Sequence, residues 1–496
     1  MSRFNTSRKP IKTHNHANGK ASSIDKKTEL YTAVCTASLQ NKFYEKSPQS
    51  LQRIQSLIES VDPEFVQKLA IYARNDMNLR SIPIVIAVEL AKAGKLTHKT
   101  VSRIIKRPDE ITEMLAYYVQ RNERNGIKKL NKLSKAIHKG IKYIFESGKF
   151  DEYQYAKYNR DGEIRLRDAL FITHPKPSIR EQHELFRKIA NDNLKTPDTW
   201  EVKISEAGSD SVRKREAWEE LILSRKLPYM ASVRNLRNVL ESNVSNAAFD
   251  QICNYISNPV AVQKSRMFPF RFMSAYREID QLDIPRVSAV KETLEAAAKE
   301  SSKNLPGFGT DTSVFVAIDT SGSMSRVISP RSRISYQDIA LTMAAIIKER
   351  CTLTTLGIFG TTFKEVMIPN TPILETATKM MRISGDVGHL THAHLSIDHL
   401  IKNNISIDKV IMFSDMQVYG TGGQGEISSA WKKYKRDINP NSELILFDLA
   451  GYGTMPLDIR GDKTYVISGW SDKTFNIISD IKEGRTAIQK IEQIPL

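Results

Sequence analysis

Between residues 27 and 305, apolar residues recur at helical spacing. In Val66–Arg74 the apolar side chains fall on one face of a helix, and Pro63 stands where a first turn tolerates proline. Further helices are predicted at 84–93, 101–105, 111–119, 130–145, 167–172, 179–189, 217–223, 232–240 and 289–298. Breakers separate them at Pro83, Pro108, Gly126, Pro175, Pro197, Pro228 and Pro259. Many short helices with almost no strand-like alternation predict an α-solenoid of stacked helix pairs. The polar residues 1–26 before it predict an N-terminal tail.

The pattern changes after Pro306, where short continuous apolar runs replace the helical spacing. Such runs occur at 314–319, 355–359, 409–415, 444–449 and 464–468, with helical segments between them and a last helix from Phe475. Strands that are apolar on both faces and alternate with helices are typical of a parallel sheet covered on both sides. We therefore expect residues 311–496 to form a doubly wound α/β domain.

Hard oxygen ligands gather at the ends of two predicted strands. Asp319, Ser321 and Ser323 follow the first strand at alternate positions of a tight loop, and Asp415 follows a later strand. Thr391 lies on an intervening loop. Doubly wound sheets bind ligands at the carboxyl ends of their strands, and Mg²⁺ prefers oxygen ligands while keeping several waters. The spacing predicts a divalent metal site, with Mg²⁺ as the cofactor.

The motif Asp-Thr-Ser-Gly-Ser-Met at 319–324, followed by a distant Thr and a further Asp, resembles the metal-ion-dependent adhesion site of von Willebrand factor A domains. By this resemblance Asp319, Ser321 and Ser323 ligate the ion, and Thr391 and Asp415 complete the shell directly or through water. The double glycine often found before that Thr is missing here. In the family, an acidic group of a partner protein can complete the coordination.

The net positive charge lies entirely before the α/β domain. Residues 1–310 hold 53 Lys and Arg against 36 Asp and Glu, whereas residues 311–496 hold 20 of each. The excess is densest in residues 91–150, with 15 basic and 5 acidic side chains. Such a field attracts polyanions, and the binding should weaken with salt. A basic solvated surface is the simpler reading of the same charge.

Size and cysteine content limit the class of protein. A chain of 496 residues is long enough for two or three domains. It holds three widely spaced cysteines, which make neither a disulfide framework nor a zinc site and favour a reducing, cytoplasmic setting. The sequence shows no apolar stretch near the ~20 residues of a membrane span and no signal-peptide core.

Seven groups of residues before the α/β domain resemble the TROVE domain of Ro autoantigens and their bacterial relatives. They are Asn15–Gly19, Leu69–Arg74 with Leu79–Pro83, Arg167–Leu170 with Thr173–Pro177, Thr196–Glu201, Trp218 with Lys226–Ala231, Arg234–Asn238 and Lys264–Phe272. With an A domain after them, the resemblance covers nearly the whole chain. It implies a ring of HEAT-like helical repeats that the A domain closes.

The resemblance also implies a function. Ro proteins are noncatalytic RNA-binding proteins that hold single-stranded ends of misfolded RNA in the ring's hole and small structured Y RNAs on the outer basic surface. On this chain the matching outer residues are Lys157, His174 and Arg160, the last displaced by one position. A helix cap before Pro175 is the structural alternative for His174. The densest basic segment adds Arg124, Lys128, Lys129, Lys132 and Lys135, at spacings that favour one helical face and phosphate contact.

The expected partners are therefore RNA and, in RNA quality control or degradation, an exoribonuclease, with the chain itself a monomer and no membrane involved. A protein-interaction scaffold that uses the metal site remains the alternative. A metal-dependent nuclease is disfavoured because only Asp319 and Asp415 supply carboxylates. The cluster His389, His392 and His394 lacks a cysteine or spaced carboxylate, so we interpret it as solvated rather than zinc-binding.

Overall fold

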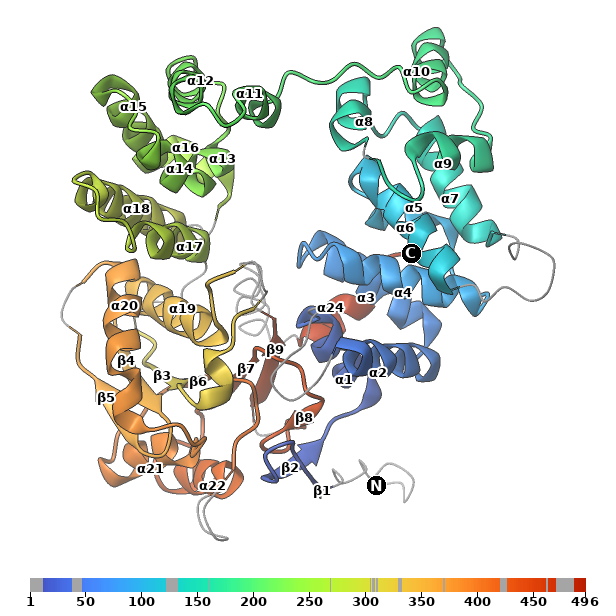
Figure 1. Ribbon diagram of the computed structural model, residues 1–496. Helices are drawn as coiled ribbons and strands as arrows, with labels where there is room; N and C mark the ends of the chain where they lie inside the picture. The colour runs from blue at the N-terminus through green and yellow to red at the C-terminus, as the bar shows by residue number, and fades with distance from the viewer. Residues whose placement is uncertain are drawn as a thin grey trace. The chain divides into compact units, whose positions relative to one another are not determined.

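The computed structural model describes residues 12–37, 47–121, 133–159, 161–267, 269–303, 305, 308, 311–328, 332–368, 371–419, 426–460, 463–469 and 486–496 (Figure 1). The chain divides into two compact units. The first comprises Met1–Ser50 and Lys203–Ala487, and the second comprises Leu51–Val202 and Ile488–Leu496. The boundary expected from the sequence between the helical and α/β parts, near residues 305–311, lies inside the first unit.

The second unit consists of short helices that pack against near neighbours in the chain. Its helices are α2 (Ser47–Ser60, which begins in the first unit), α3 (Pro63–Asn75), α4 (Ser81–Lys92), α5 (His98–Ile104), α6 (Pro108–Arg121), α7 (Lys135–Glu146), α8 (Glu152–Tyr158), α9 (Leu166–Thr173) and α10 (Arg180–Ala190). Helix α3 packs on α4, α5 on α7, and α7 on α9. Helices α11 (Trp200–Glu206) and α24 (Ala487–Glu492) cross the boundary between the units.

A charge network stabilises the packing of α3, α4 and α6. The buried carboxylate of Glu110 pairs with Arg74 at 2.6 Å, and Asp109 pairs with Arg80 and with Arg107, each at 2.7 Å. Removing one partner of such a pair would leave a buried charge uncompensated, which costs roughly 3–5 kcal/mol. Several basic residues of this region therefore serve the fold.

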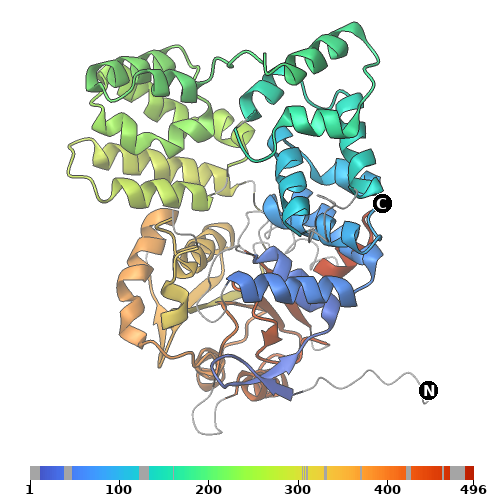
Figure 2. The ribbon, with the colours of Figure 1, turned by 45° about the vertical axis from the view of Figure 1, so that its right-hand side comes forward.

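The first unit contains the remaining helical repeats. They are α12 (Ser211–Leu223), α13 (Tyr229–Arg234), α14 (Leu236–Glu241), α15 (Asn246–Ser257), α16 (Pro259–Ser265), α17 (Pro269–Ile279) and α18 (Val287–Ser302), stacked as Figure 2 shows. The single helix expected at 232–240 is two helices, because the backbone at Asn235 leaves the helical region and ends α13 before α14 begins.

Prolines mark the beginnings of several helices. Pro108 and Pro259 are the first residues of α6 and α16, and Pro83 lies in the first turn of α4. The sequence pattern predicts Pro83, Pro108 and Pro259 as breakers between helices. The first N–H groups of a helix have no partner within it, so proline is tolerated there. Pro63, with Asp62 as the N-cap, begins α3 as expected.

A six-stranded sheet forms the α/β part of the first unit, which confirms the predicted fold class. Its order is β5 (Phe363–Val366), β4 (Thr354–Phe359), β3 (Val314–Asp319), β6 (Lys409–Ser414), β7 (Glu443–Asp448) and β9 (Thr464–Ser468). All neighbours are parallel except the edge strand β5, which is antiparallel to β4. The sheet is thus mixed, with β3 near its centre.

Helices cover both faces of this sheet (Figure 1). On one side lie α19 (Tyr336–Arg350) and α20 (Ile373–Ile383), and on the other α21 (His394–Lys402) and α22 (Ile427–Asp437). Phe315 and Ala317 of β3 pack in one core cluster with Ile397 and Trp431 of α21 and α22. Because side chains alternate along a strand, the other residues of β3 face the opposite layer.

The polar N-terminal segment is not only a tail. Residues Lys12–His14 (β1) and Lys20–Ser23 (β2) form an antiparallel pair, and β2 also pairs with β8 (Thr454–Met455). Helix α1 (Lys26–Cys35) follows, and the hydroxyl of its Tyr31 accepts a hydrogen bond from the N–H of Ser468. The sequence shows no alternation of apolar and polar residues in this segment. Its strands were therefore not predicted, because their pairing depends on strand β8, which lies more than four hundred residues later in the chain.

None of the described helices is both long and apolar enough to cross a membrane. The helix expected from Phe475 begins outside the described residues.

Candidate functional site

The loop after β3 presents the first group of oxygen atoms. Asp319 ends the strand and is completely buried, and its Oδ1 accepts a hydrogen bond of 2.9 Å from the N–H of Ser321. A short 3₁₀ helix, η1 (Gly322–Ser325), follows and places the hydroxyls of Ser321 and Ser323 3.3 Å apart. All three side chains are buried, so their polar atoms require partners inside the protein.

The end of the neighbouring strand β6 supplies the second group. Ser414 donates a hydrogen bond of 2.6 Å to Oδ2 of Asp319, which ties the two strand ends together. Asp415 follows, buried, and its Oδ1 accepts from the N–H of Gln417 at 3.0 Å. Met416 has a left-handed backbone (φ 62°), a conformation that costs energy for a side chain with a Cβ. Local strain of this kind concentrates at functional loops.

Backbone hydrogen bonds join these two loops to the loop that carries Thr391. The N–H of Gly322 donates to the carbonyl of His389, and the N–H of Tyr419 donates to the carbonyl of Thr391. The five residues predicted as metal ligands thus lie on three loops that are hydrogen-bonded to one another. For Thr391 the described contact is made by its backbone, not by its hydroxyl.

The site concentrates negative charge in a buried position. Burial, and then the charge of Asp415, raises the pKa of Asp319 to about 7. Burial also raises the pKa of Asp415, while the hydroxyl of Ser323 partly offsets that shift. Among the described residues, no Lys or Arg is one of the leading causes of either shift. Two neighbouring buried carboxylates are a costly arrangement unless a positive ion is bound.

These residues fit a hard divalent cation. Oδ2 of Asp415 is buried and accepts no hydrogen bond within the described residues, so one carboxylate oxygen is left for another ligand. Two carboxylates and several hydroxyls match the oxygen ligands of Mg²⁺, and waters would fill the rest of its octahedral shell. Within the described residues there is no group of three or more His, Cys, Asp or Glu side chains arranged to hold a metal, so hydroxyls are required.

The histidine cluster differs from the solvated loop expected from the sequence. His392 and His394 are buried, with ring centroids 5.8 Å apart, and only His389 is exposed. Nδ1 of His392 lies 3.0 Å from the carbonyl oxygen of Thr361, and its ring packs edge-on against Tyr419. The histidines are buried because residues 391–394 lead from the site into α21, which packs on the sheet.

Two supporting features were not found from the sequence. Ser414 stands beside a predicted ligand, but its bond to Asp319 depends on β3 and β6 being neighbours. The N-terminal hairpin also contacts the loop after β6: Nδ2 of Asn15 donates to the carbonyl of Val418 at 2.7 Å, and the N–H of His16 donates to Oε1 of Gln417. The motif Asn15–Gly19 was singled out as a family resemblance, without a structural role.

The candidate RNA-binding residues lie in the second unit. Lys157, half-buried in α8, holds its ammonium group 5.9 Å from the ring centre of Tyr153. His174 is exposed and ends α9 with a left-handed backbone (φ 44°). Lys135 is exposed at the first position of α7. Within the described part of the chain, the side chains of Lys135, Lys157 and His174 form no hydrogen bond or ring contact with one another. Outside the described residues lie Arg124, Lys128, Lys129, Lys132 and Arg160.

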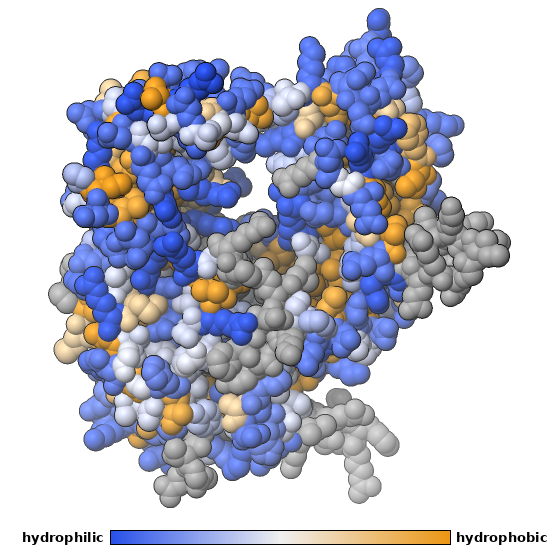
Figure 3. Space-filling view, in the orientation of Figure 1, coloured by the Kyte–Doolittle hydropathy of each residue, from blue (hydrophilic) through white to orange (hydrophobic). Residues whose placement is uncertain are grey.

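Exposed apolar side chains accompany these basic residues. Tyr153 is 50% exposed, and Phe171 and Ile172 in the last turn of α9 are 51% and 43% exposed. The space-filling view shows hydrophobic residues in scattered groups on a mostly hydrophilic surface (Figure 3). Aromatic rings beside cations are what a nucleic-acid surface uses to stack bases and hold phosphates.

Comparison with known proteins identifies the family. The TROVE domain family matches residues 19–195 and 192–313, and the Ro60 von Willebrand factor A domain family matches residues 313–482. The chain belongs to the Ro family. This confirms the family resemblance that the sequence motifs predict.

This Ro-family chain is also similar to one solved structure in fold and to two curated proteins in part of its sequence. It resembles the crystal structure of the Deinococcus radiodurans Ro (RSR) protein with a TM-score of 0.62 and 15% sequence identity, covering 93% of this chain and all of that one. It is 25% identical over 344 aligned residues to telomerase protein component 1 of Mus musculus and of Rattus norvegicus. Those matches cover 52% of this chain and 13% of each relative.

Proposed function

We propose that this Ro-family protein binds two kinds of RNA, small structured noncoding RNAs similar to Y RNA and the single-stranded ends of misfolded RNA, without cleaving either. The location of charge carries the proposal. All of the net positive charge lies in residues 1–310, outside the A domain, so a phosphate backbone is attracted to the helical repeats. The threading of RNA ends also requires the closed ring that the family resemblance implies, and that ring stays a prediction.

The surface around the end of α9 supports the outer RNA-binding site. His174 points from a helix end without a hydrogen bond from its ring within the described residues, and Phe171 and Ile172 are exposed beside it in sequence. A ring that accepts or donates hydrogen bonds, next to apolar groups, fits the sugar and base surface of a structured RNA.

We infer that the A domain holds Mg²⁺ through Asp319, Ser321 and Ser323, with Thr391 and Asp415 completing the shell. The bound ion would leave a position open for a carboxylate of a protein partner. Buried Oδ2 of Asp415, which accepts no hydrogen bond among the described residues, favours the binding of the ion. The site would therefore recruit a partner such as an exoribonuclease, with the chain acting as a monomer in the cytoplasm, while the helical repeats hold the RNA.

One experiment separates RNA binding from cleavage and from a pure scaffold role. The full chain is incubated with an end-labelled hairpin RNA that carries a single-stranded 3′ tail, in Mg²⁺ and in EDTA, and complex and RNA length are both measured. We expect a complex with intact RNA in both buffers. Shortened RNA in Mg²⁺ alone would indicate a nuclease, and the absence of a complex in either buffer would leave only the scaffold role.

A further inference from the structure

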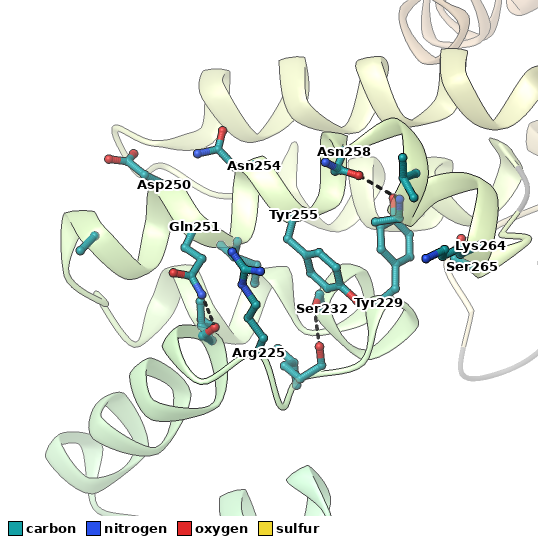
Figure 4. Close-up of a pocket in the computed structure, with 16 residues that line it drawn as sticks. Arg225, Tyr229, Ser232, Asp250, Gln251, Asn254, Tyr255, Asn258, Lys264 and Ser265 are labelled. Atoms are coloured by element: carbon teal, nitrogen blue, oxygen red, sulfur yellow. Dashed lines mark hydrogen bonds between the residues drawn. The ribbon is translucent and has the colours of Figure 1, made fainter.

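A cavity opens between the helical repeats of the first unit, away from the A-domain site. Its volume is about 830 Å³, within the range of ligand-binding pockets. The end of α12, helix α13 and helices α15 and α16 line it (Figure 4). None of the RNA-binding or metal-binding residues expected from the sequence contributes to this lining.

An aromatic ring stands in the middle of the cavity. Tyr255 of α15 is 38% exposed although it lies in a concave surface. The ring of buried Tyr229 packs edge-on against it, with centroids 5.5 Å apart and planes at 75°. Tyr229 is fixed in turn, because its hydroxyl donates a hydrogen bond of 2.5 Å to the carbonyl of Ile256. The Tyr255 ring is therefore supported on its inner side and open on the other.

Two cations line the same cavity. In the view of Figure 4, Arg225 lies next to Tyr255, and Lys264 lies on the opposite side, beyond the ring of Tyr229. Both side chains are exposed, and neither forms an ion pair or a hydrogen bond with the described residues. Backbone hydrogen bonds in the turn after α12 hold Arg225 in a left-handed conformation (φ 57°), which fixes where its side chain starts. Asp250 is the one carboxylate in the lining, at the far end from Lys264.

Amide groups border the same space. Asn254, one residue before the ring, is exposed and makes no side-chain hydrogen bond within the described residues. Oδ1 of Asn258 accepts the N–H of Ala261 at 3.0 Å, which leaves the amide hydrogens of Asn258 available to a ligand. An amide offers both a donor and an acceptor, as the Watson–Crick edge of a base does.

We propose that this cavity binds a nucleotide of single-stranded RNA, with the base stacked on Tyr255 and its edge on Asn254, and the adjoining phosphates on Arg225 and Lys264. The proposal rests on the RNA-binding function proposed above and adds a defined subsite to it. Proteins that bind single-stranded RNA stack its bases on exposed aromatic rings and contact its phosphates with cationic side chains near those rings. Tyr255, Arg225 and Lys264 could act in this way. An acidic peptide would use the cations but would leave the ring and the free amide without partners.

The test uses the full chain and a labelled hexauridylate, with affinity measured by fluorescence anisotropy. We expect Tyr255→Ala to weaken binding about tenfold, since the variant loses the aromatic ring on which a base would stack. Tyr255→Phe, which keeps the ring, should bind as the unchanged protein does. Arg225→Gln should weaken binding about threefold and lower the salt slope by ~0.7, as expected for one lost phosphate contact.

Arg215→Gln is the matched control, because Arg215 is exposed on α12 of the same repeats but does not line the cavity. If hexauridylate binds tightly and Tyr255→Ala, Arg225→Gln and Arg215→Gln all bind alike, the cavity is not the subsite, although RNA binding stands. If the unchanged protein binds no RNA of any kind, the proposed function fails as well. Equal losses for Tyr255→Ala and Tyr255→Phe would also overturn the stacking role.

Discussion

His174 can act as the cap that ends helix α9 and as a residue that contacts RNA. Its N–H donates to the carbonyl of Leu170 and its backbone is left-handed, so it ends α9, while its ring is exposed. Glycine adopts this backbone without strain, whereas alanine keeps the penalty of a Cβ. Two substitutions at this position therefore separate the helix cap from RNA contact.

We predict that His174→Gly keeps or slightly raises the thermal stability of the protein and that His174→Ala leaves it little changed or lowers it by less than ~1 kcal/mol. Both should weaken binding of a structured RNA about equally, by roughly five- to tenfold, because both remove the ring. Thermal unfolding and a gel shift on the same preparations give the two readouts. Unchanged RNA affinity in both variants would reduce His174 to a helix cap.

A second prediction concerns the paired carboxylates. Asp415→Asn removes one of two buried negative charges but can keep the hydrogen bond from the N–H of Gln417. Without Mg²⁺ the variant should be more stable than the unchanged protein, on the order of 1 kcal/mol, since like charges no longer face each other. Added Mg²⁺ should raise the melting temperature of the unchanged protein but not of the variant.

Asp398→Asn is the control, since Asp398 is an exposed carboxylate on α21 outside the three loops. It should respond to Mg²⁺ as the unchanged protein does. A Mg²⁺ response that persists in Asp415→Asn would show that the ion binds elsewhere.

Among the structural elements, the N-terminal hairpin supports the loop after β6. Gly19 lies so close to Val418 that a Cβ would collide with the Val418 carbonyl oxygen and come within 2.7 Å of the Cβ of Tyr419. We predict that Gly19→Ala destabilises the protein by roughly 1–3 kcal/mol and weakens its Mg²⁺ response, because the hairpin must move away from the loop. Gly385→Ala, whose Cβ would meet no atom within 4 Å, is the control for thermal unfolding. Equal stability of the two variants would contradict this role.

Glu295 of α18 links the helical repeats to the A domain within the first unit. Its carboxylate accepts the N–H groups of Leu374 and Glu375 at the start of α20, at 3.0 and 2.6 Å. Burial, opposed by these hydrogen bonds and reinforced by the charges of Glu375 and Glu349, raises its pKa from 4.5 to about 7. The folded state therefore holds this proton more tightly than the unfolded state does.

The consequence is a pH-dependent stability. The contribution of a carboxyl group with a raised pKa is largest below pH ~4.5 and is lost as pH rises towards ~7. Glu295→Gln has no proton to lose, so between these pH values the melting temperature of the unchanged protein should fall relative to this variant. The corresponding decrease in the free energy of unfolding of the unchanged protein, relative to the variant, is on the order of 1–2 kcal/mol. Glu292→Gln, at an exposed position of the same helix, should show no such trend.

The sequence predicted the helices and strands that have a hydrophobic pattern within their own residues. The central strands are continuous apolar runs because helices cover both faces of the sheet, and most helices showed their spacing directly. Edge strand β5, with two exposed residues among four, and the polar strands β1 and β2 gave no such signal. Their pairing depends on segments distant in sequence or on an exposed edge, which a local pattern does not encode.

The same limit applies to the candidate sites. Asp319 and Asp415 could be singled out because each ends an apolar run. The bond from Ser414 to Asp319 and the burial of His392 depend on which strands and loops become neighbours. The cavity around Tyr255 is formed by four helices, and although Tyr229 and Lys264 fall within segments that carry the family resemblance, nothing along the chain shows that they line one cavity with Tyr255.

At the scale of the whole molecule, the uneven distribution of charge along the chain indicates which part binds RNA. A net charge of +17 lies entirely in residues 1–310, while the A domain is neutral overall. A molecule with this distribution should bind polyanions through one part and leave the other available for a metal-dependent contact. Affinity for RNA should consequently fall steeply as salt releases the bound counterions.

The most direct measurement is a gel shift at two salt concentrations with three ligands. They are a structured RNA with a single-stranded 3′ tail, its blunt counterpart and a duplex DNA of matched length. We predict tight binding of the tailed RNA, weaker binding of the blunt RNA and the weakest of DNA, with every affinity lower at the higher salt concentration. Equal weak binding of all three would contradict specific RNA recognition and reduce the basic surface to a solvated one.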